Sequence, residues 1–145
     1  MEERIKYMTS ALGILEDIEI HLNALKKALH EDSEFFKKFY SISSIEILGL
    51  QTKKLSLMNA PRDLSEEHGL LRKITDKAYN LSGLFSLKDD KFIGEFDELF
   101  DVVMSDIKCL RDRLFSELFS ALFSMIYPYD KEWVDMPDVG FEIID

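Results

Sequence analysis

The sequence predicts an all-α fold, a four-helix bundle-like domain with a long C-terminal helix and an irregular acidic tail. Apolar residues recur every three or four positions through most of the chain, as they do in amphipathic helices. Hydrophobic residues make up 46% of the 145 residues, which is enough to fill the core of a single domain. Prolines follow the second and fourth apolar stretches and end them. We expect residues 1–128 to form the bundle and residues 129–145 to form the tail.

The first helix is expected over residues 2–30. Its large apolar residues follow one another at steps of three or four, which places them along one side of a helix. The acidic residues Glu16, Asp17 and Glu19 mark the side that faces water. The apolar side consists of Ile5, Met8, Leu12, Leu15, Ile18, Leu22, Leu25 and Leu29.

The second segment, residues 35–58, allows two interpretations. Phe35, Phe39, Ile42, Ile45, Leu48 and Leu55 fit the spacing of a helix, which is the interpretation we favour. Its β-branched residues and Gly49 are also compatible with a hairpin over residues 45–57, which would make the fold α+β with one small hairpin. Pro61 ends the segment in either case.

Two further helices complete the predicted bundle. The third is expected over residues 63–85, because Asp63 and Glu66 have the spacing of a capping box. Its apolar side has Leu70 or Leu71, then Ile74, Ala78, Leu81 and Phe85. The fourth is expected over residues 91–127, and Pro128 ends it. Its apolar positions are Phe92, Phe96, Leu99, Val103, Ile107, Leu110, Leu114, Leu118, Leu122 and Met125.

The charge of the chain restricts its partners. The formal net charge is −10, so binding of DNA or RNA through a basic face and docking on anionic lipid are not expected. A protein partner, in particular a basic one, suits such a surface. The polar start of the chain and the lack of a long apolar run predict a cytoplasmic protein without a membrane segment. Cys109 is the only cysteine and lies beside Leu110, so we expect a buried, inert thiol.

The end of the fourth helix contains a repeated tetrad. Leu-Phe-Ser-Glu, Leu-Phe-Ser-Ala and Leu-Phe-Ser-Met follow one another over residues 114–125. Each four-residue step turns the helix by about 400°, so successive tetrads are rotated by about 40°. Leucines and phenylalanines therefore cover more of the helix than one core contact requires. Either this helix lies at the centre of the bundle, or Phe115, Phe119 and Phe123 bind a partner or a second copy.

The tail over residues 129–145 combines acidic and large apolar residues. Its six acidic residues and one lysine give it half of the net charge of the chain. Such alternation is typical of a short segment that binds a basic, grooved partner, with Trp133, Met136 and Phe141 as its contacts. The alternative is that Trp133 and Phe141 pack on the tail's own bundle.

One short motif indicates a different function. Arg62, the polar Asp63 and His68, six positions after the arginine, resemble the motif of HEPN endoribonucleases. That family is all-helical, of about this size and commonly dimeric, and two copies of its motif meet across the dimer to cleave RNA. The resemblance implies that Arg62 would stabilise the phosphate, that His68 would act as acid or base, and that Asp63 would be the polar neighbour.

The other chemistry-bearing residues predict no further site. Acidic residues on the first and fourth helices, such as Glu16 and Glu95, are interpreted as facing water, so no metal site is expected. The glycines stand singly, so no phosphate-binding loop and no cofactor are expected. The leading interpretation is a non-enzymatic interaction protein, a small subunit, adaptor or inhibitor that forms homo-oligomers. The alternatives are the HEPN-like ribonuclease and an acidic mimic of nucleic acid.

Overall fold

The computed structural model describes residues 2–30, 34–85 and 90–126, and of their side chains all but those of residues 34–41, 84–85 and 90–93. It contains four long helices, α1 (Glu2–Leu29), α2 (Glu34–Ser56), α3 (Ser65–Phe85) and α4 (Asp90–Ile126). A short 3-10 helix, η1 (Arg62–Leu64), precedes α3. The described residues form no strand, so the predicted all-α fold is confirmed and the alternative hairpin at 45–57 is wrong.

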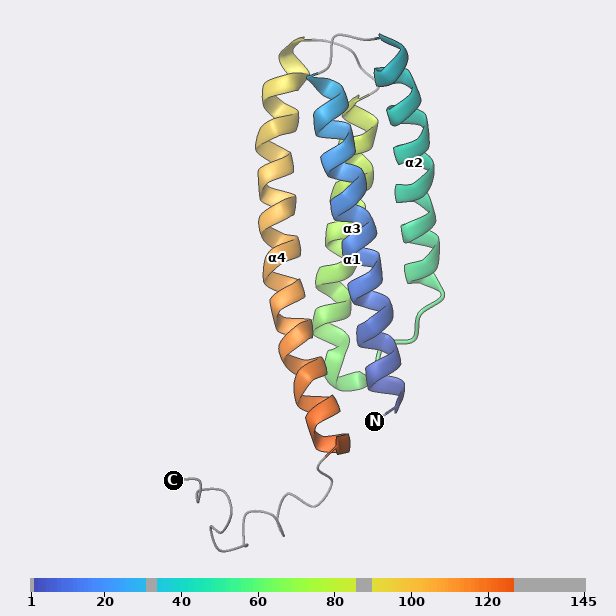
Figure 1. Cartoon of the computed structure of the whole chain (residues 1–145), viewed down its shortest axis with the longest axis vertical. Coiled ribbons are helices and arrows are strands. Elements are labelled where there is room, and N and C mark those ends of the chain that lie inside the picture. Colours follow the sequence, from blue (N-terminus) through green and yellow to red (C-terminus); the bar gives the residue numbers. More distant parts are fainter. Residues whose placement is uncertain (1, 31–33, 86–89, 127–145) are drawn as a thin grey trace, which may run out of the picture.

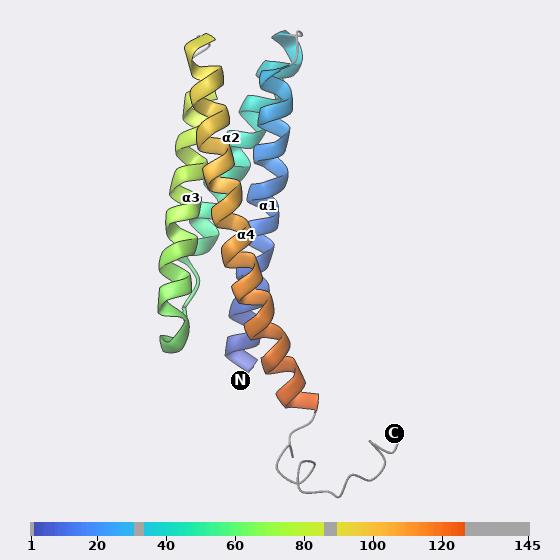
Figure 2. The same cartoon turned by 90° about the vertical axis from the view of Figure 1, so that its left-hand side faces the viewer.

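The bundle is of the up-down-up-down type. Each helix runs antiparallel to the next, and α1 packs against both α2 and α4 (Figure 1). Helix α3 packs against the same two helices, so α2 and α4 lie on opposite sides of the bundle. Turned by 90°, the four helices remain nearly parallel, and the end of α4 extends past the start of α1 (Figure 2). The start of α1, the end of α2, the start of α3 and the end of α4 therefore share one end of the molecule.

Sequence features at the helix ends agree with these boundaries. Glu2 and Glu3 lie in the first turn of α1, and Lys26 and Lys27 lie in its last turn. These charges interact favourably with the helix dipole at both ends and so stabilise the helix. The start of α3 differs from the prediction, because the 3-10 helix before it has no side-chain cap. The Asp63 carboxylate instead lies 2.9 Å from Nε of Arg4 on α1.

The segment for which the sequence allowed either a helix or a hairpin forms the helix α2. Its buried side chains Ser44, Leu48, Gln51 and Leu55 follow at steps of four, three and four, which only a helix brings onto one face. Gly49 keeps helical backbone, and a Cβ built on it would approach the Tyr79 ring of α3 at 3.8 Å. Burial of the leucine side chains therefore outweighs the strand preference of the β-branched residues.

The core is apolar on the α1 and α4 side and partly polar on the α2 and α3 side. Apart from Tyr7, whose hydroxyl lies within hydrogen-bonding distance of His68, every buried residue of α1 is apolar, and the same holds for the described part of α4. In contrast, Ser44, Gln51, Thr75 and Ser82 are buried on α2 and α3, at spacings of seven residues. The Thr75 and Ser82 hydroxyls donate to carbonyls of their own helix, whereas Oε1 of Gln51 has no partner among the described residues.

Several positions expected to be buried are exposed in the structure, among them Ile42 on α2 and Leu122 and Met125 near the end of α4. Leu99 is exposed, and the neighbouring Phe100 is buried in its place. Cys109, which was expected to be a buried thiol, is also exposed. Ile107 and Leu110 take the inward positions of that turn, and residue 109 lies too far round the helix to reach the core. Within the described part of the chain, no helix is long and apolar enough to cross a membrane.

Candidate protein-interaction site

The end of α4 presents an apolar surface to solvent. Leu114 and Ala121 are buried against the bundle, and Leu118 packs on the core from a half-buried position. The other large residues of this segment are turned away from the bundle, with 52% of Phe115 and 72% of Phe119 exposed. We call the outward residues the end face of α4. It consists of Phe115, Phe119, Leu122, Phe123 and Ile126.

Helical spacing explains why these five residues share one face. They follow Phe115 at steps of four, seven, eight and eleven residues, which keeps all five within an arc of about 100° around the helix. The rings of Phe119 and Phe123 stack, with centroids 6.5 Å apart and planes inclined by 16°. Met125 is also exposed, on another side of the same helix. The prediction that this segment carries more apolar surface than one core contact requires therefore agrees with the exposure of these side chains.

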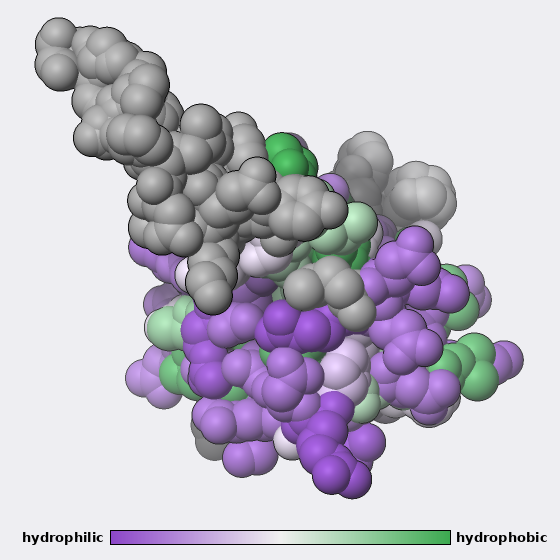
Figure 3. Space-filling model, turned by 90° about the horizontal axis from the view of Figure 1, so that it is seen from below, coloured by the Kyte–Doolittle hydropathy of each residue, from purple (hydrophilic) through white to green (hydrophobic). Residues whose placement is uncertain are grey.

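The end face carries no charge. Residues 118–126 are Leu, Phe, Ser, Ala, Leu, Phe, Ser, Met and Ile, so nine consecutive residues lack an ionisable side chain. Figure 3 shows the molecule from the end at which α4 finishes. Outside the grey atoms most of that surface is hydrophilic, and hydrophobic surface lies beside the grey atoms. An uncharged apolar face within an acidic surface can bind another apolar face without burying a charge.

A polar cluster at the same end of the bundle was not found from the sequence. The hydroxyl of Tyr7 on α1 lies 2.8 Å from Nδ1 of His68 on α3, within hydrogen-bonding distance. Nη2 of Arg113 on α4 donates to Glu67 at 2.9 Å and to Glu66 at 3.3 Å. These partners are 46 to 61 residues apart in the chain, so no local pattern connects them.

Burial is the largest cause of the pKa shifts of Tyr7 and His68 in this cluster. It raises the pKa of Tyr7 to about 12, with a smaller contribution from the nearby Glu67 carboxylate. Burial also lowers the pKa of His68 below its usual 6.5, and the positive charge of Arg72 lowers it further. The hydrogen bond with Glu66 is the largest of several effects that together raise the pKa of Arg113. The cluster is therefore built around a neutral tyrosine and a neutral histidine at neutral pH.

The structure separates the residues of the nuclease-like motif. Arg62 is exposed in η1, whereas Asp63 is engaged by Arg4 and the His68 ring packs beside Tyr7, with centroids 5.7 Å apart. No hydrogen bond or ion pair joins Arg62 to His68 among the described residues. A second copy would be needed to combine two such motifs, so catalysis by Arg62 and His68 stays a prediction.

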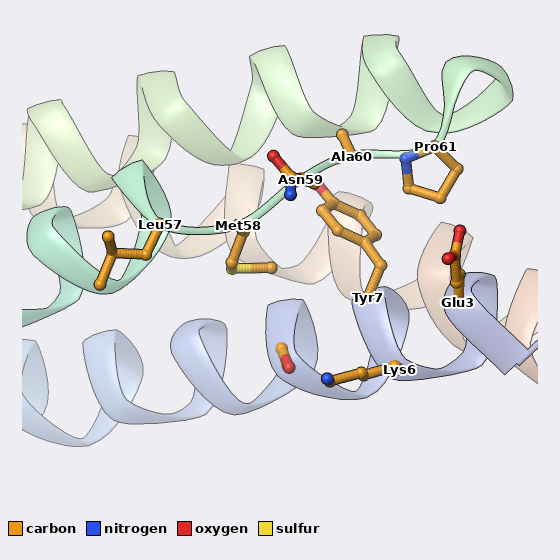
Figure 4. Close-up of a pocket in the computed structure, with 9 residues that line it drawn as sticks. Glu3, Lys6, Tyr7, Leu57, Met58, Asn59, Ala60 and Pro61 are labelled. Atoms are coloured by element: carbon orange, nitrogen blue, oxygen red, sulfur yellow. The ribbon is translucent and has the colours of Figure 1, made fainter.

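A groove lies between α1 and the connection from α2 to η1. Its volume is about 420 Å³, and Tyr7, Met58 and Pro61 form much of its wall. Figure 4 shows the Tyr7 ring reaching from α1 towards Asn59 and Ala60, with Lys6 and Glu3 on the α1 side. The groove is small and carries one charge of each sign, so it indicates no particular ligand.

Trp133, Met136 and Phe141 of the acidic tail lie outside the described residues. Within the described ranges, no three His, Cys, Asp or Glu side chains gather in a way that could hold a metal ion.

Comparison of the chain with protein-family models, with curated proteins and with solved structures finds no match.

The Tyr7–His68 contact leads to a testable pH dependence. The folded protein binds a proton at His68 less readily than the unfolded chain does. The stability that depends on neutral His68 is therefore fully present above the unfolded pKa of about 6.5. Stability should then decrease as the pH falls through that value. We expect the decrease in unfolding free energy between about pH 7.5 and about pH 5.5 to become smaller in His68→Gln. Urea denaturation at the two pH values measures it.

The matched control for this experiment is His21→Gln. His21 lies on α1 away from the Tyr7 contact, so the difference between the two pH values should stay as in the wild type. An equally large difference in His68→Gln and the wild type would contradict the prediction.

Proposed function

We propose that this chain is a non-enzymatic interaction protein that associates with a second copy of itself through the end face of α4. The observation that carries the proposal is the exposure of Phe115 and Phe119 on an uncharged helix end. Contiguous apolar surface of this kind is uncommon on proteins that stay monomeric, because water makes its exposure unfavourable. Large aromatic side chains are also the residues that contribute most to protein–protein affinity.

The charge of the chain supports a second copy as the partner at this face. Two copies with a net charge of −10 repel one another over most of their surfaces. Residues 118–126 are uncharged, so contact there brings the fewest like charges together. A small interaction subunit of this kind would offer its acidic tail, with Trp133, Met136 and Phe141, to a further, basic partner.

Phe119→Asp tests the self-association. A buried aromatic anchor typically contributes about 2 kcal/mol to an interface, which corresponds to about a 30-fold change in affinity. The substitution places a charge at the centre of the end face, and we expect the dissociation constant of the dimer to rise by at least that factor. Sedimentation velocity or light scattering over a range of protein concentrations measures it.

Leu50→Asp is the matched control. Leu50 is an exposed apolar residue of α2, on the opposite side of the bundle from α4, and it receives the same new charge. Its dissociation constant should equal that of the wild type. A wild-type chain that stays monomeric at all concentrations would reject the proposal, and so would equal losses of affinity in the two variants.

A further inference from the structure

We infer that the two copies pair through their end faces in an antiparallel manner, with the two-fold axis passing between Ser120 and Ala121. The inference rests on the proposed self-association and adds the geometry of the pair. In this arrangement Phe115 of one copy is level with Ile126 of the other, and Phe119 is level with Leu122. These two aromatic rings therefore meet aliphatic side chains, and both copies use the same surface.

The charge along α4 disfavours a parallel pair. Asp101, Lys108 and Asp112 precede Phe115 by fourteen, seven and three residues, so they continue the direction of the end face towards the start of the helix. All three side chains are exposed. In a parallel pair each of these side chains would lie opposite the same residue of the other chain, and like charges that face each other are destabilising. An antiparallel pair that overlaps only over residues 115–126 leaves these charges outside the contact.

The C-terminal end of α4 adds a second electrostatic argument. The helix dipole gives this end a partial negative charge, and residues 129–145 of the sequence hold six acidic residues and one lysine. A parallel pair would place two such negative ends side by side. An antiparallel pair moves them to opposite ends of the contact, so their repulsion is reduced by distance and by salt.

The shape of the bundle permits the antiparallel pair. Figures 1 and 2 both show the end of α4 extending past the start of α1 at one end of the molecule. Most of the bundle lies on the N-terminal side of the end face along α4, although Arg4 of α1 still reaches Glu117 and Ala121 is still buried. When two α4 ends overlap in opposite directions, most of each bundle lies at opposite ends of the contact, and the bundle contacts of Leu118 and Ala121 lie on a side of α4 other than the end face.

The single native cysteine provides a test that needs no substitution. Cys109 is exposed on α4 and can carry a spin label. It lies between eleven and twelve residues from the proposed axis. At 1.5 Å per residue, the two Cys109 positions of an antiparallel pair are therefore about 35 Å apart along the helix direction. In a parallel pair only the distance between two packed helices, about 10 Å, separates them. Pulsed electron–electron double resonance on the labelled dimer measures the long separation, and dipolar broadening of the continuous-wave spectrum reports the short one.

A second label confirms that the measured dimer uses the end face. Ser120→Cys in a Cys109→Ser background places the label beside the proposed axis, so a short distance between the labels is expected. A long Cys109 distance together with a short residue-120 distance supports the inference. A short Cys109 distance in a genuine dimer overturns the antiparallel geometry and leaves the proposed self-association in place. A monomer without any dipolar signal overturns both.

Discussion

Leu15→Ala is expected to lower the free energy of unfolding by about 3 kcal/mol, as measured by urea denaturation. Leu15 lies at the middle of the apolar side of α1 and has no exposed surface. The substitution removes three carbon atoms from a closely packed region and leaves a cavity that the four surrounding helices can close only in part. A loss of this size is a large fraction of the stability of a domain of 145 residues.

Ile20→Ala is the control for this variant. Ile20 is an aliphatic residue on the same helix, but 52% of it is exposed, because its position faces away from the bundle. Its replacement should change the free energy of unfolding by less than about 0.5 kcal/mol. Equal losses in the two variants would mean that α1 is rotated relative to the described packing.

Arg113→Ala is expected to lower the free energy of unfolding by about 2 kcal/mol, although the Arg113 side chain itself is 44% exposed. The reason is its partner Glu67, whose side chain is only 11% exposed and accepts a hydrogen bond from Arg113 at 2.9 Å. Without the guanidinium, a nearly buried carboxylate keeps its desolvation cost and loses its counter-charge. Chemical denaturation at neutral pH measures the change.

Glu66 supplies the matched control for the ion pair. It accepts from the same guanidinium at 3.3 Å, but its side chain is 75% exposed, so water can replace the arginine. Glu66→Ala should have little effect, and Glu67→Gln should restore part of the stability lost in Arg113→Ala. An Arg113→Ala protein as stable as the wild type would show that Glu67 is not held by this pair.

The long-range architecture could be predicted because it depends on a repeated signal. In α1 and α4 the apolar period continues through many turns, so single exceptions do not change the assignment. In α2 the period is short and the residues are β-branched, which left helix and hairpin open until packing decided between them. The apolar period did not predict equally well which single residues face the core. Leu99 and Phe100 are adjacent apolar residues, and periodicity alone does not show which of them faces the core.

The sequence predicted one part of the candidate site, the end face of α4, but not the other part, the polar cluster around Tyr7 and His68. The end face of α4 is a local property of one helix, so the repeated Leu-Phe-Ser tetrads indicated it directly. The cluster of Tyr7, His68, Glu67 and Arg113 is formed by three helices that meet only in the folded bundle. The motif of Arg62 and His68 is local as well, but the sequence did not reveal that Tyr7 would occupy one nitrogen of the histidine ring.

The contact between α1 and α4 should delay the completion of folding during synthesis, because α4 follows the other three helices in the chain. Arg111 and Lys26 illustrate it: Arg111 donates to Glu19 of α1, and the Lys26 ammonium lies over the Phe100 ring of α4. While α4 is still on the ribosome, the nascent α1, α2 and α3 leave the α4-facing side of α1 in water. Release of the last helix therefore closes the core, and a chain stopped before residue 100 should be a substrate for chaperones and proteases.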